Sequence, residues 1–153
     1  MAHYTLTTTW KIDKPIEKIW DELIKFEDWP KWWKSIKHVR LEKLKNNTLV
    51  LHFTWKGILP YSLTFPIIIT YLDPMKWIEG EAKGDLEGRG ICAISSTKTQ
   101  TTITFTWNVS TKKRWMNIVA PIAKPIFSWN HNNIMQQGAK GLARYLKVKV
   151  TSK

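Results

Sequence analysis

The chain has 153 residues, 43% of them hydrophobic and 24% charged, a balance typical of one globular domain rather than of a disordered segment. It contains no run of 18 apolar residues and no basic region followed by an apolar stretch at its start, so we expect neither a transmembrane helix nor a secretory signal. Its one cysteine, Cys92, excludes an internal disulfide and favours a cytoplasmic location.

The net charge of +12 is distributed unevenly along the chain. Residues 1–87 contain 13 basic and 12 acidic side chains, whereas residues 88–153 contain 11 basic side chains and no acidic one. This asymmetry predicts an anionic partner, either a membrane surface touched peripherally or the acidic head of a ligand. The residues expected to form the anionic contact are Lys112, Lys113, Arg114, Lys140, Arg144 and Lys147. The alternative is that these charges only prevent aggregation.

The first part of the chain predicts a strand followed by a helix. Apolar and polar residues alternate over 4–12, which predicts a half-buried strand. Apolar residues then recur at helical spacing over 16–24, and Asp13 is placed to cap this helix. Trp29-Pro30 interrupts the pattern, and a second short helical turn is expected over 31–33.

The middle of the chain predicts a series of strands joined by short turns. They are expected at residues 36–44, 49–55, 63–72, 76–83, 86–96 and 101–109. Pro66 argues for an edge strand or a bulge, and Gly84-Asp85 indicates a two-residue hairpin turn. The loop at 56–61 carries bulky apolar residues, which suit a pocket gate, a membrane-touching tip or a segment folded back onto the core.

The last part of the chain, residues 114–148, predicts a helix. Pro121 and Pro125 are expected to break or kink its beginning, and from Pro125 to Lys147 it would extend roughly 35 Å. Short connections between consecutive strands imply an antiparallel sheet. The sequence therefore predicts a single α+β domain over residues 1–153, in which a curved sheet of about six or seven strands wraps around the long C-terminal helix.

This order of elements resembles the helix-grip fold of the START and birch-pollen-allergen superfamily, and more closely the polyketide cyclase/dehydrase-like SRPBCC proteins. The segments that carry the resemblance are Pro15–Trp20, Trp29–Trp33, Gly88–Gly90, Thr106–Val109, Phe127–His131, Met135, Gly138 and Gly141–Leu142. The superfamily includes lipid carriers, hormone receptors and cyclases, so the resemblance implies a fold and leaves the function open.

Apolar residues lie on one face of the predicted strands and on one face of the last helix. Where these faces meet, we expect an internal ligand cavity. The residues expected to bind the ligand are Trp55, Phe105, Trp107, Phe127, His131, Met135 and Arg89. His131 would hydrogen-bond a polar group of the ligand or move a proton, or it would be a core histidine satisfied within the protein. Trp10, Trp55 and Trp107 share their faces with aliphatic residues, which argues against a nucleic-acid interface.

The hairpin over 76–96 offers a second candidate site. A two-residue turn would place Glu81 opposite Gly88 and Glu79 opposite Gly90, with Arg89 on the other face. If the glutamates faced inward, they would be candidates for acid–base chemistry. The alternative is a solvent-facing pair balanced by lysines, because unpaired buried charges are costly.

These patterns favour binding or transport of a small hydrophobic or amphipathic ligand, such as a lipid, an isoprenoid or an aromatic polyketide. The alternative is a cyclase- or dehydrase-type enzyme that uses His131 or an inward glutamate as its acid or base. A third possibility is an interaction protein with a solid interior. The four histidines show no metal-ligand spacing, and no cofactor motif is present, so we expect neither metal nor cofactor.

Overall fold

The computed structural model describes residues 3–57, 62–111 and 114–153, without the side chains of residues 111–124, 126 and 127. The apolar loop expected at 56–61 therefore lies mostly outside the described residues. The elements, in chain order, are β1 (His3–Ile12), η1 (Ile16–Lys18), α1 (Trp20–Leu23), η2 (Phe26–Asp28), α2 (Trp29–Trp32), β2 (Ile36–Lys43), β3 (Leu49–Trp55), β4 (Leu63–Asp73), β5 (Trp77–Ala82), β6 (Leu86–Ser96), β7 (Thr101–Thr111), α3 (Arg114–Leu146) and β8 (Val150–Ser152).

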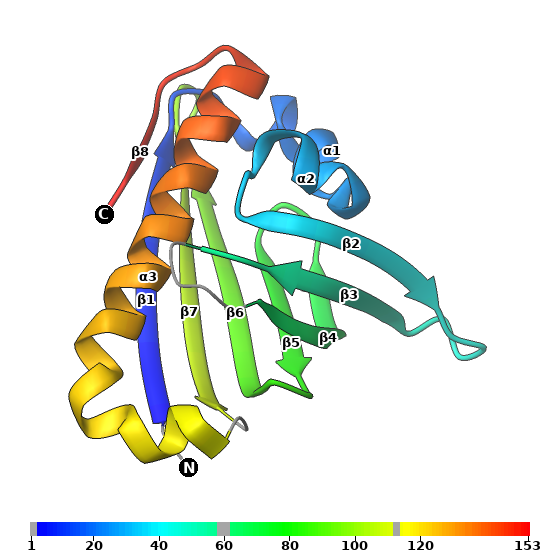
Figure 1. The fold of residues 1–153 in the computed structure, drawn as a ribbon. Helices are drawn as coiled ribbons and strands as arrows, with labels where there is room; N and C mark the ends of the chain where they lie inside the picture. The colour runs from blue at the N-terminus through cyan, green and yellow to red at the C-terminus, as the bar shows by residue number, and fades with distance from the viewer. Residues whose placement is uncertain (1–2, 58–61, 112–113) are drawn as a thin grey trace.

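The described strands form one antiparallel sheet in the order β2-β3-β4-β5-β6-β7-β1-β8. The long helix α3 lies across one face of this sheet beside β1, and the short helices pack at one end (Figure 1). The predicted α+β helix-grip class is confirmed, and the sheet has eight strands instead of six or seven. The strand that sequence reasoning missed is β8, whose three residues pair with the end of β1.

Helix α3 continues through both of its prolines. The ribbon changes direction within its first, yellow part and then runs straight along the sheet (Figure 1). The prolines therefore bend the helix rather than end it. At the other end, Lys147 has a φ of 56°, and the Val148 N–H donates to the Ala143 carbonyl at 3.1 Å. This 6→1 bond is the signature of a Schellman cap, which stops the helix before β8.

Pro66 lies in β4, which is an interior strand and not the predicted edge. Pro66 does not interrupt the pairing of β4 with β5, because β5 ends at Ala82. The edge of Pro66 that lacks an N–H therefore faces the turn after β5, beyond the paired residues of the two strands. Its carbonyl accepts the Lys83 N–H at 3.1 Å. The β4–β5 pair is irregular elsewhere, between Ile69 and Tyr71.

The hairpin register differs by one residue from the expected one. Glu81 pairs with Arg89 and Gly80 with Gly90, because the connection is longer than a two-residue turn. Ala82 pairs with Gly88, which leaves residues 83–87 between them, and Gly84 adopts a φ of 91°. A shift by one residue exchanges the faces of a strand relative to its partner, so it changes which side chains meet.

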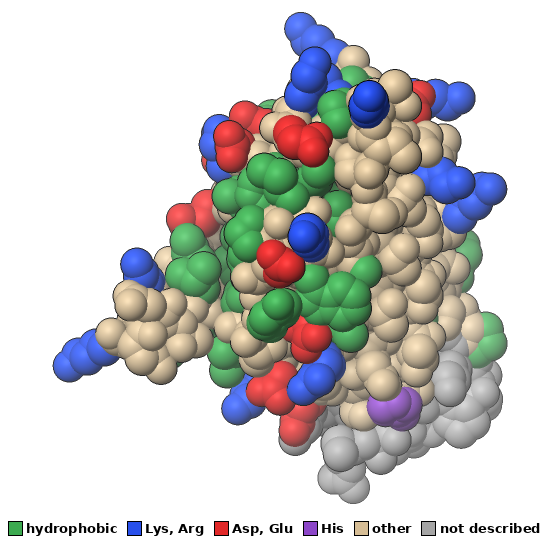
Figure 2. Space-filling model, turned by 180° about the vertical axis from the view of Figure 1, so that it is seen from behind, with side chains coloured by type: hydrophobic (Ala, Val, Ile, Leu, Met, Phe, Trp, Pro, Cys, Tyr) green, Lys and Arg blue, Asp and Glu red, His purple; other side chains and the backbone are tan. Residues whose placement is uncertain are grey.

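The outer face of the sheet carries a mixture of hydrophobic, acidic and basic side chains (Figure 2). A shallow hollow on this face is lined by Tyr71, Trp77 and Glu79, among others. The opposite face of the sheet, toward α3, supplies most of the buried core. Alternation along the strands thus separates an outer face of mixed character from an apolar interior.

Two glycines allow α3 to approach its neighbours closely. A Cβ added at Gly138 would lie 2.5 Å from Trp33 and 2.7 Å from Trp10. A Cβ added at Gly141 would collide with the backbone carbonyl oxygen of Trp32. Both glycines therefore serve close packing of the helix.

Replacing Gly141 with Ala tests this packing. Ala favours a helix over Gly by about 1 kcal/mol. The collision with a backbone carbonyl should cost about 3 kcal/mol, because α2 must shift to relieve it. We expect urea unfolding to show a net loss of about 2 kcal/mol in the free energy of unfolding. The neighbouring exposed residue gives a control, and Lys140→Ala should stay within about 0.5 kcal/mol of the wild type. A Gly141→Ala protein as stable as the wild type would contradict the packing role.

Candidate functional site: an apolar cavity

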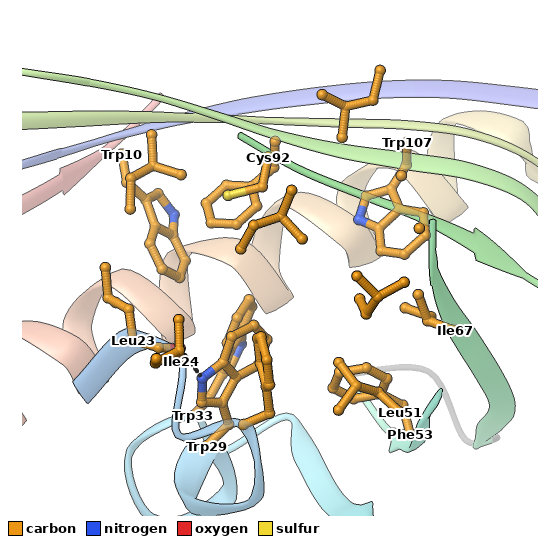
Figure 3. Close-up of a pocket in the computed structure, with 18 of the residues that line it drawn as sticks. Trp10, Leu23, Ile24, Trp29, Trp33, Leu51, Phe53, Ile67, Cys92 and Trp107 are labelled. Atoms are coloured by element: carbon orange, nitrogen blue, oxygen red, sulfur yellow. Dashed lines mark hydrogen bonds between the residues drawn. The ribbon is translucent and has the colours of Figure 1, made fainter. Parts of the chain in front are cut away.

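A cavity of about 120 Å³ lies between the sheet, the short helices and α3. Figure 3 shows it with Trp10, Cys92 and Trp107 on the side of the sheet and Trp29 and Trp33 opposite. Strand β3 contributes a third side through residues that include Leu51, Phe53 and Trp55. Helix α3 adds Met135.

The described lining consists of Trp, Phe, Leu, Ile, Met, Cys and Gly. It therefore presents no charged side chain and no side-chain oxygen. Its polar side-chain groups are the indole N–H groups, the Cys92 thiol and the Met135 thioether. A cavity of this kind binds through burial and shape.

Ring contacts make the walls rigid. Trp32 and Trp33 stack with their centroids 5.5 Å apart at 21°. Trp10 meets Phe105 edge to face at 4.8 Å, and Trp55 meets Trp107 at 6.3 Å and 88°. Such pairs contribute about 0.5–1.5 kcal/mol each beyond their area burial.

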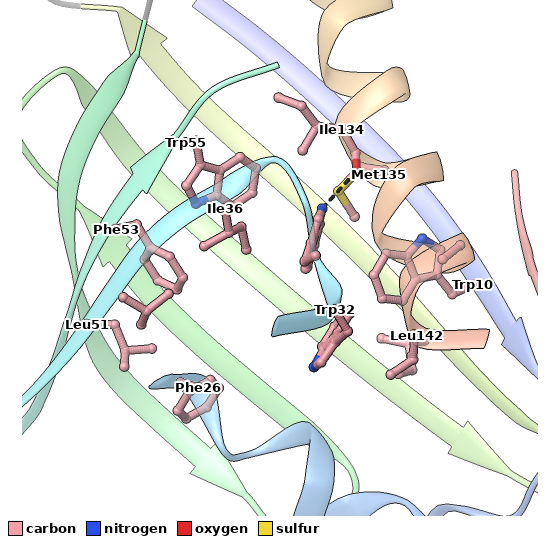
Figure 4. Close-up of a cluster of buried hydrophobic side chains, with 14 of the residues drawn as sticks. Trp10, Phe26, Trp32, Ile36, Leu51, Phe53, Trp55, Ile134, Met135 and Leu142 are labelled. Carbon is pink, nitrogen blue, oxygen red and sulfur yellow. Dashed lines mark hydrogen bonds between the residues drawn. The ribbon is translucent and has the colours of Figure 1, made fainter. Parts of the chain in front are cut away.

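Hydrogen bonds fix two of the rings. The Trp33 indole donates to the Ile134 carbonyl of α3 at 2.8 Å, and the Trp29 indole donates to the Leu23 carbonyl at 2.9 Å. Figure 4 shows the first of these bonds beside Met135, between the short helices and α3. The hydrogen bond of Trp33 therefore holds the wall formed by the short helices against α3.

On the sheet, Gly90 makes room for one of the lining rings. Gly90 pairs with Trp107, and a Cβ on it would lie 2.9 Å from the Trp107 ring. The ring thus lies across the glycine. Within the Gly-Arg-Gly segment of the sequence, Gly90 thus leaves the space that the Trp107 ring occupies.

The structure brings four of the seven predicted ligand-binding residues to the cavity wall: Trp55, Phe105, Trp107 and Met135. The side chain of Phe127 lies outside the described residues. His131 is buried but is not among the lining residues, and Arg89 lies on the other face of the sheet. Their roles in binding stay predictions.

Sequence reasoning did not assign the wall contributed by the short helices. This wall includes Leu23, Ile24, Phe26, Trp29, Trp32 and Trp33. The available signal was the density of aromatic residues over 26–33, where four of eight positions are Phe or Trp. Nothing in the local sequence indicates that these residues face β3 and β7.

Glu79, Glu81 and Arg89 lie together on the outer face of the sheet. Ile78 and Gly80 of β5 line the cavity, and the alternate residues Glu79 and Glu81 point to the other face. The Arg89 guanidinium lies 3.7 Å from the Glu79 carboxylate, which also accepts the Trp77 indole N–H at 2.8 Å. The expected separation of Arg89 from the glutamates is therefore wrong, because the register places Arg89 opposite Glu81.

His131 is held in its neutral form. Burial lowers the pKa of His131 to about 4, and the side chain of Asn132 opposes this shift without reversing it. Among the described residues neither ring nitrogen has a hydrogen-bond partner with acceptable geometry. A histidine with this pKa is uncharged at neutral pH.

Cys92 is the thiol of the cavity wall. Burial raises the pKa of Cys92 to about 12. The thiol is therefore protonated at neutral pH, and it lacks the thiolate that nucleophilic cysteines need.

The predicted basic surface is only partly described. Lys140 and Arg144 are exposed on the last turns of α3, and Lys147, also exposed, is the αL residue that follows the helix. Lys112, Lys113 and the side chain of Arg114 lie outside the described residues. Contact of this surface with an anionic membrane stays a prediction.

No group of three or more His, Cys, Asp or Glu side chains in the part of the chain that the structure describes is arranged to hold a metal ion. Among the helices described, none is long and apolar enough to span a membrane.

Stability should depend on pH through His131. The unfolded state binds a proton with a pKa near 6.5, while the folded state does so only near 4, so stability is complete above pH 6.5 and falls as the pH drops toward 4. Between pH 7.5 and 5 this amounts to about 2 kcal/mol. Urea unfolding at the two pH values should show a smaller difference for His131→Leu. An exposed histidine, His38, provides the control: His38→Gln should keep the wild-type difference. Equal pH dependence in all three proteins would contradict the assignment.

No protein-family model matches the chain, and the search of curated proteins found no match. Solved structures with the same fold are found. A START superfamily protein from Mycobacterium smegmatis is 17% identical with a TM-score of 0.70, covering 95% of this chain and 98% of that one. A Streptomyces aromatase/cyclase is 10% identical with a TM-score of 0.66, covering 94% and 96%.

A third structure, a point mutant of norcoclaurine synthase from Thalictrum flavum with a transition-state analogue, is 12% identical with a TM-score of 0.57, covering 95% of this chain and 97% of that one. At these identities the similarity concerns the fold. The chain therefore has the helix-grip fold of START-like and polyketide cyclase-like proteins, in agreement with the resemblance carried by its sequence segments.

Proposed function

We propose that the protein binds a small, uncharged, largely apolar molecule in the cavity and does not transform it. The observation that carries this proposal is the lining, which among the described residues has no charged side chain and no side-chain oxygen. Burial of apolar surface then supplies the affinity. The similarity to START-like and cyclase structures supports a fold that encloses such molecules.

The size of the cavity limits the ligand. A cavity of about 120 Å³ is comparable to engineered apolar cavities of about 150 Å³ that take up benzene. A one-ring molecule that buries roughly 200 Å² gains about 5 kcal/mol, which corresponds to a Kd on the order of 0.1–1 mM. A lipid, an isoprenoid or a multi-ring polyketide would need the walls to move apart.

The cyclase or dehydrase alternative requires an acid or base beside the ligand. The candidates Glu79 and Glu81 belong to the outer face, and His131 is not part of the described lining. Cys92, which does line the cavity, is a neutral thiol. Binding without catalysis needs none of these groups, so we favour it.

Filling the cavity should abolish binding. Cys92→Phe adds a ring between Trp10 and Trp107, and Ile78→Phe adds bulk from the neighbouring strand. We expect toluene to bind the wild type with a submillimolar Kd in a calorimetric titration, and each filled variant to bind at least tenfold more weakly.

Cys92→Ser is the matched control, since it replaces the thiol without filling space and should keep toluene binding within about threefold. Far-UV circular dichroism and thermal melts identify which filled variants remain folded. Undiminished toluene binding by a folded, filled variant would refute the cavity as the binding site. Absence of toluene binding by the wild type would refute the proposed function.

A further inference from the structure

One side of α3 is left uncovered by the part of the chain that the structure describes. Figure 1 shows the orange part of α3 at the edge of the molecule, beside β1 and β8, with its outward side turned away from the sheet. We use the name basic strip for the exposed Trp129 of this helix together with five exposed basic residues on its last turns, in the turn after it and next to β8: Lys140, Arg144, Lys147, Lys149 and Lys153.

The basic strip is long and narrow. Trp129, Lys140 and Arg144 follow one another at spacings close to whole turns of an α-helix, so they lie near one line along α3. At 1.5 Å per residue this line measures about 22 Å. Trp129 is 53% exposed and stands at one end, and the cations gather at the other. Such a strip can touch an extended surface along its whole length.

The cations of the basic strip form no ion pair with any residue that the structure describes. The lysines of the short helices differ, because Lys25 lies 3.1 Å from Glu22 and Lys31 lies 3.2 Å from Asp28. One of these carboxylates reaches α3, since the Tyr145 hydroxyl donates to Glu22 at 3.4 Å, but Lys25 already neutralises it. The positive charge of the strip is therefore not balanced by the described residues.

The spacing of these charges opposes helix formation. Lys140 and Arg144 are four residues apart, where two cations destabilise a helix. The helix dipole favours a cation in the last turn, which accounts for Arg144. It does not account for Lys140, which lies further from the end, or for Lys149 and Lys153, which lie beyond the helix. An anionic partner on this side would offset the repulsion.

We propose that the protein docks through the basic strip onto the surface of a membrane that contains anionic lipids. Lysine and arginine side chains place their charges at lipid phosphates while their stems cover apolar groups. An indole ring such as that of Trp129 suits the interface between headgroups and acyl chains. The docking is independent of the proposed function, because no residue of the strip lines the cavity.

A nucleic acid is the competing partner for cations that lie beside an aromatic ring. Proteins that bind single strands use several aromatic side chains as stacking platforms along a basic groove. Among the described tryptophans only Trp129 is exposed, and Tyr145, the other exposed aromatic residue described on α3, is held toward Glu22 of α1. One ring at the end of a row of cations therefore favours the membrane.

Co-sedimentation with vesicles tests the proposal on the wild-type protein. We expect binding to vesicles of phosphatidylcholine with about 30% phosphatidylglycerol at about 0.05 M NaCl, with a partition coefficient at least about tenfold above that for phosphatidylcholine alone. Raising the NaCl concentration to about 0.5 M should remove most of this difference, because salt screens surface charges. Equal binding to both kinds of vesicle at the lower salt concentration would overturn the proposal.

Charge variants locate the contact. The strip variant replaces three cations: Lys140→Gln, Arg144→Gln and Lys149→Gln. Each basic residue near an anionic surface contributes about fivefold, so partition should fall about 100-fold. The control variant has the same net charge and replaces exposed lysines in three turns between strands: Lys45→Gln, Lys76→Gln and Lys83→Gln. It should lose no more than about fivefold, and an equal loss in both variants would overturn the proposed strip.

Trp129→Ala tests the aromatic end of the strip. It should weaken binding to the anionic vesicles about tenfold, because the ring no longer inserts. Tyr71→Ala is the matched control, since Tyr71 is 55% exposed on the outer face of the sheet and its removal should leave binding unchanged. Unchanged binding by Trp129→Ala would refute the strip as drawn. All the replaced side chains are exposed or half-buried, and thermal melts verify that the variants fold.

A single-stranded oligonucleotide and polyglutamate, at the same concentration of negative charge as the vesicles, separate the membrane from other anionic partners. Stronger binding to either, lost in the strip variant and retained in the control variant, would assign the strip to that partner and overturn the membrane proposal. The comparison of neutral and anionic vesicles uses the wild-type protein, so it decides the matter even if a variant does not fold. None of these outcomes bears on toluene binding in the cavity.

Discussion

The close approach of α3 to Trp10 and Trp33 is the contact on which the rest of the structure depends. Gly138 permits it, since a side chain there would occupy the space of both indoles. The Trp33 N–H bond to the Ile134 carbonyl then holds the short helices against the long one. Because aromatic rings are rigid and Trp10 meets Trp33 in a tilted arrangement and Phe105 edge to face, the surrounding residues cannot collapse fully, and a cavity remains beside them.

The distribution of polar groups follows from this arrangement. The strands alternate, so the glutamates and Arg89 of the β5–β6 hairpin face outward while the residues between them face the cavity. The polar side-chain groups of the described cavity lining are neutral at physiological pH: indoles, a thiol whose pKa burial raises to about 12, and the sulfur of methionine. Such a lining is suited to recognition by burial and shape, which is the basis of the proposed function.

Much of the fold could be predicted because its signals are local. Alternation identified β1, β3 and β7, and apolar runs and turn residues indicated the strands between them. The inward faces of Trp55, Phe105 and Trp107 followed from the alternation of β3 and β7. The interior position of Pro66 and the hairpin register could not be predicted in this way. The first depends on where the neighbouring strand β5 ends, and the second on a connection one residue longer than its Gly-Asp pair suggested.

The sequence by itself determined the fold class, the apolar face of each strand and the presence of a long one-sided helix, because these depend on spacing within one segment. Only the tertiary structure decided that Trp29 and Trp33, from the short helices, face Trp10 and Trp107 across a cavity. It alone also decided which indole N–H groups find a carbonyl and which have no partner among the residues that the structure describes. The physical reason is that a hydrogen bond or a ring contact between segments about a hundred residues apart, such as Trp33 and Ile134, depends on the packing of whole elements, which no local pattern encodes.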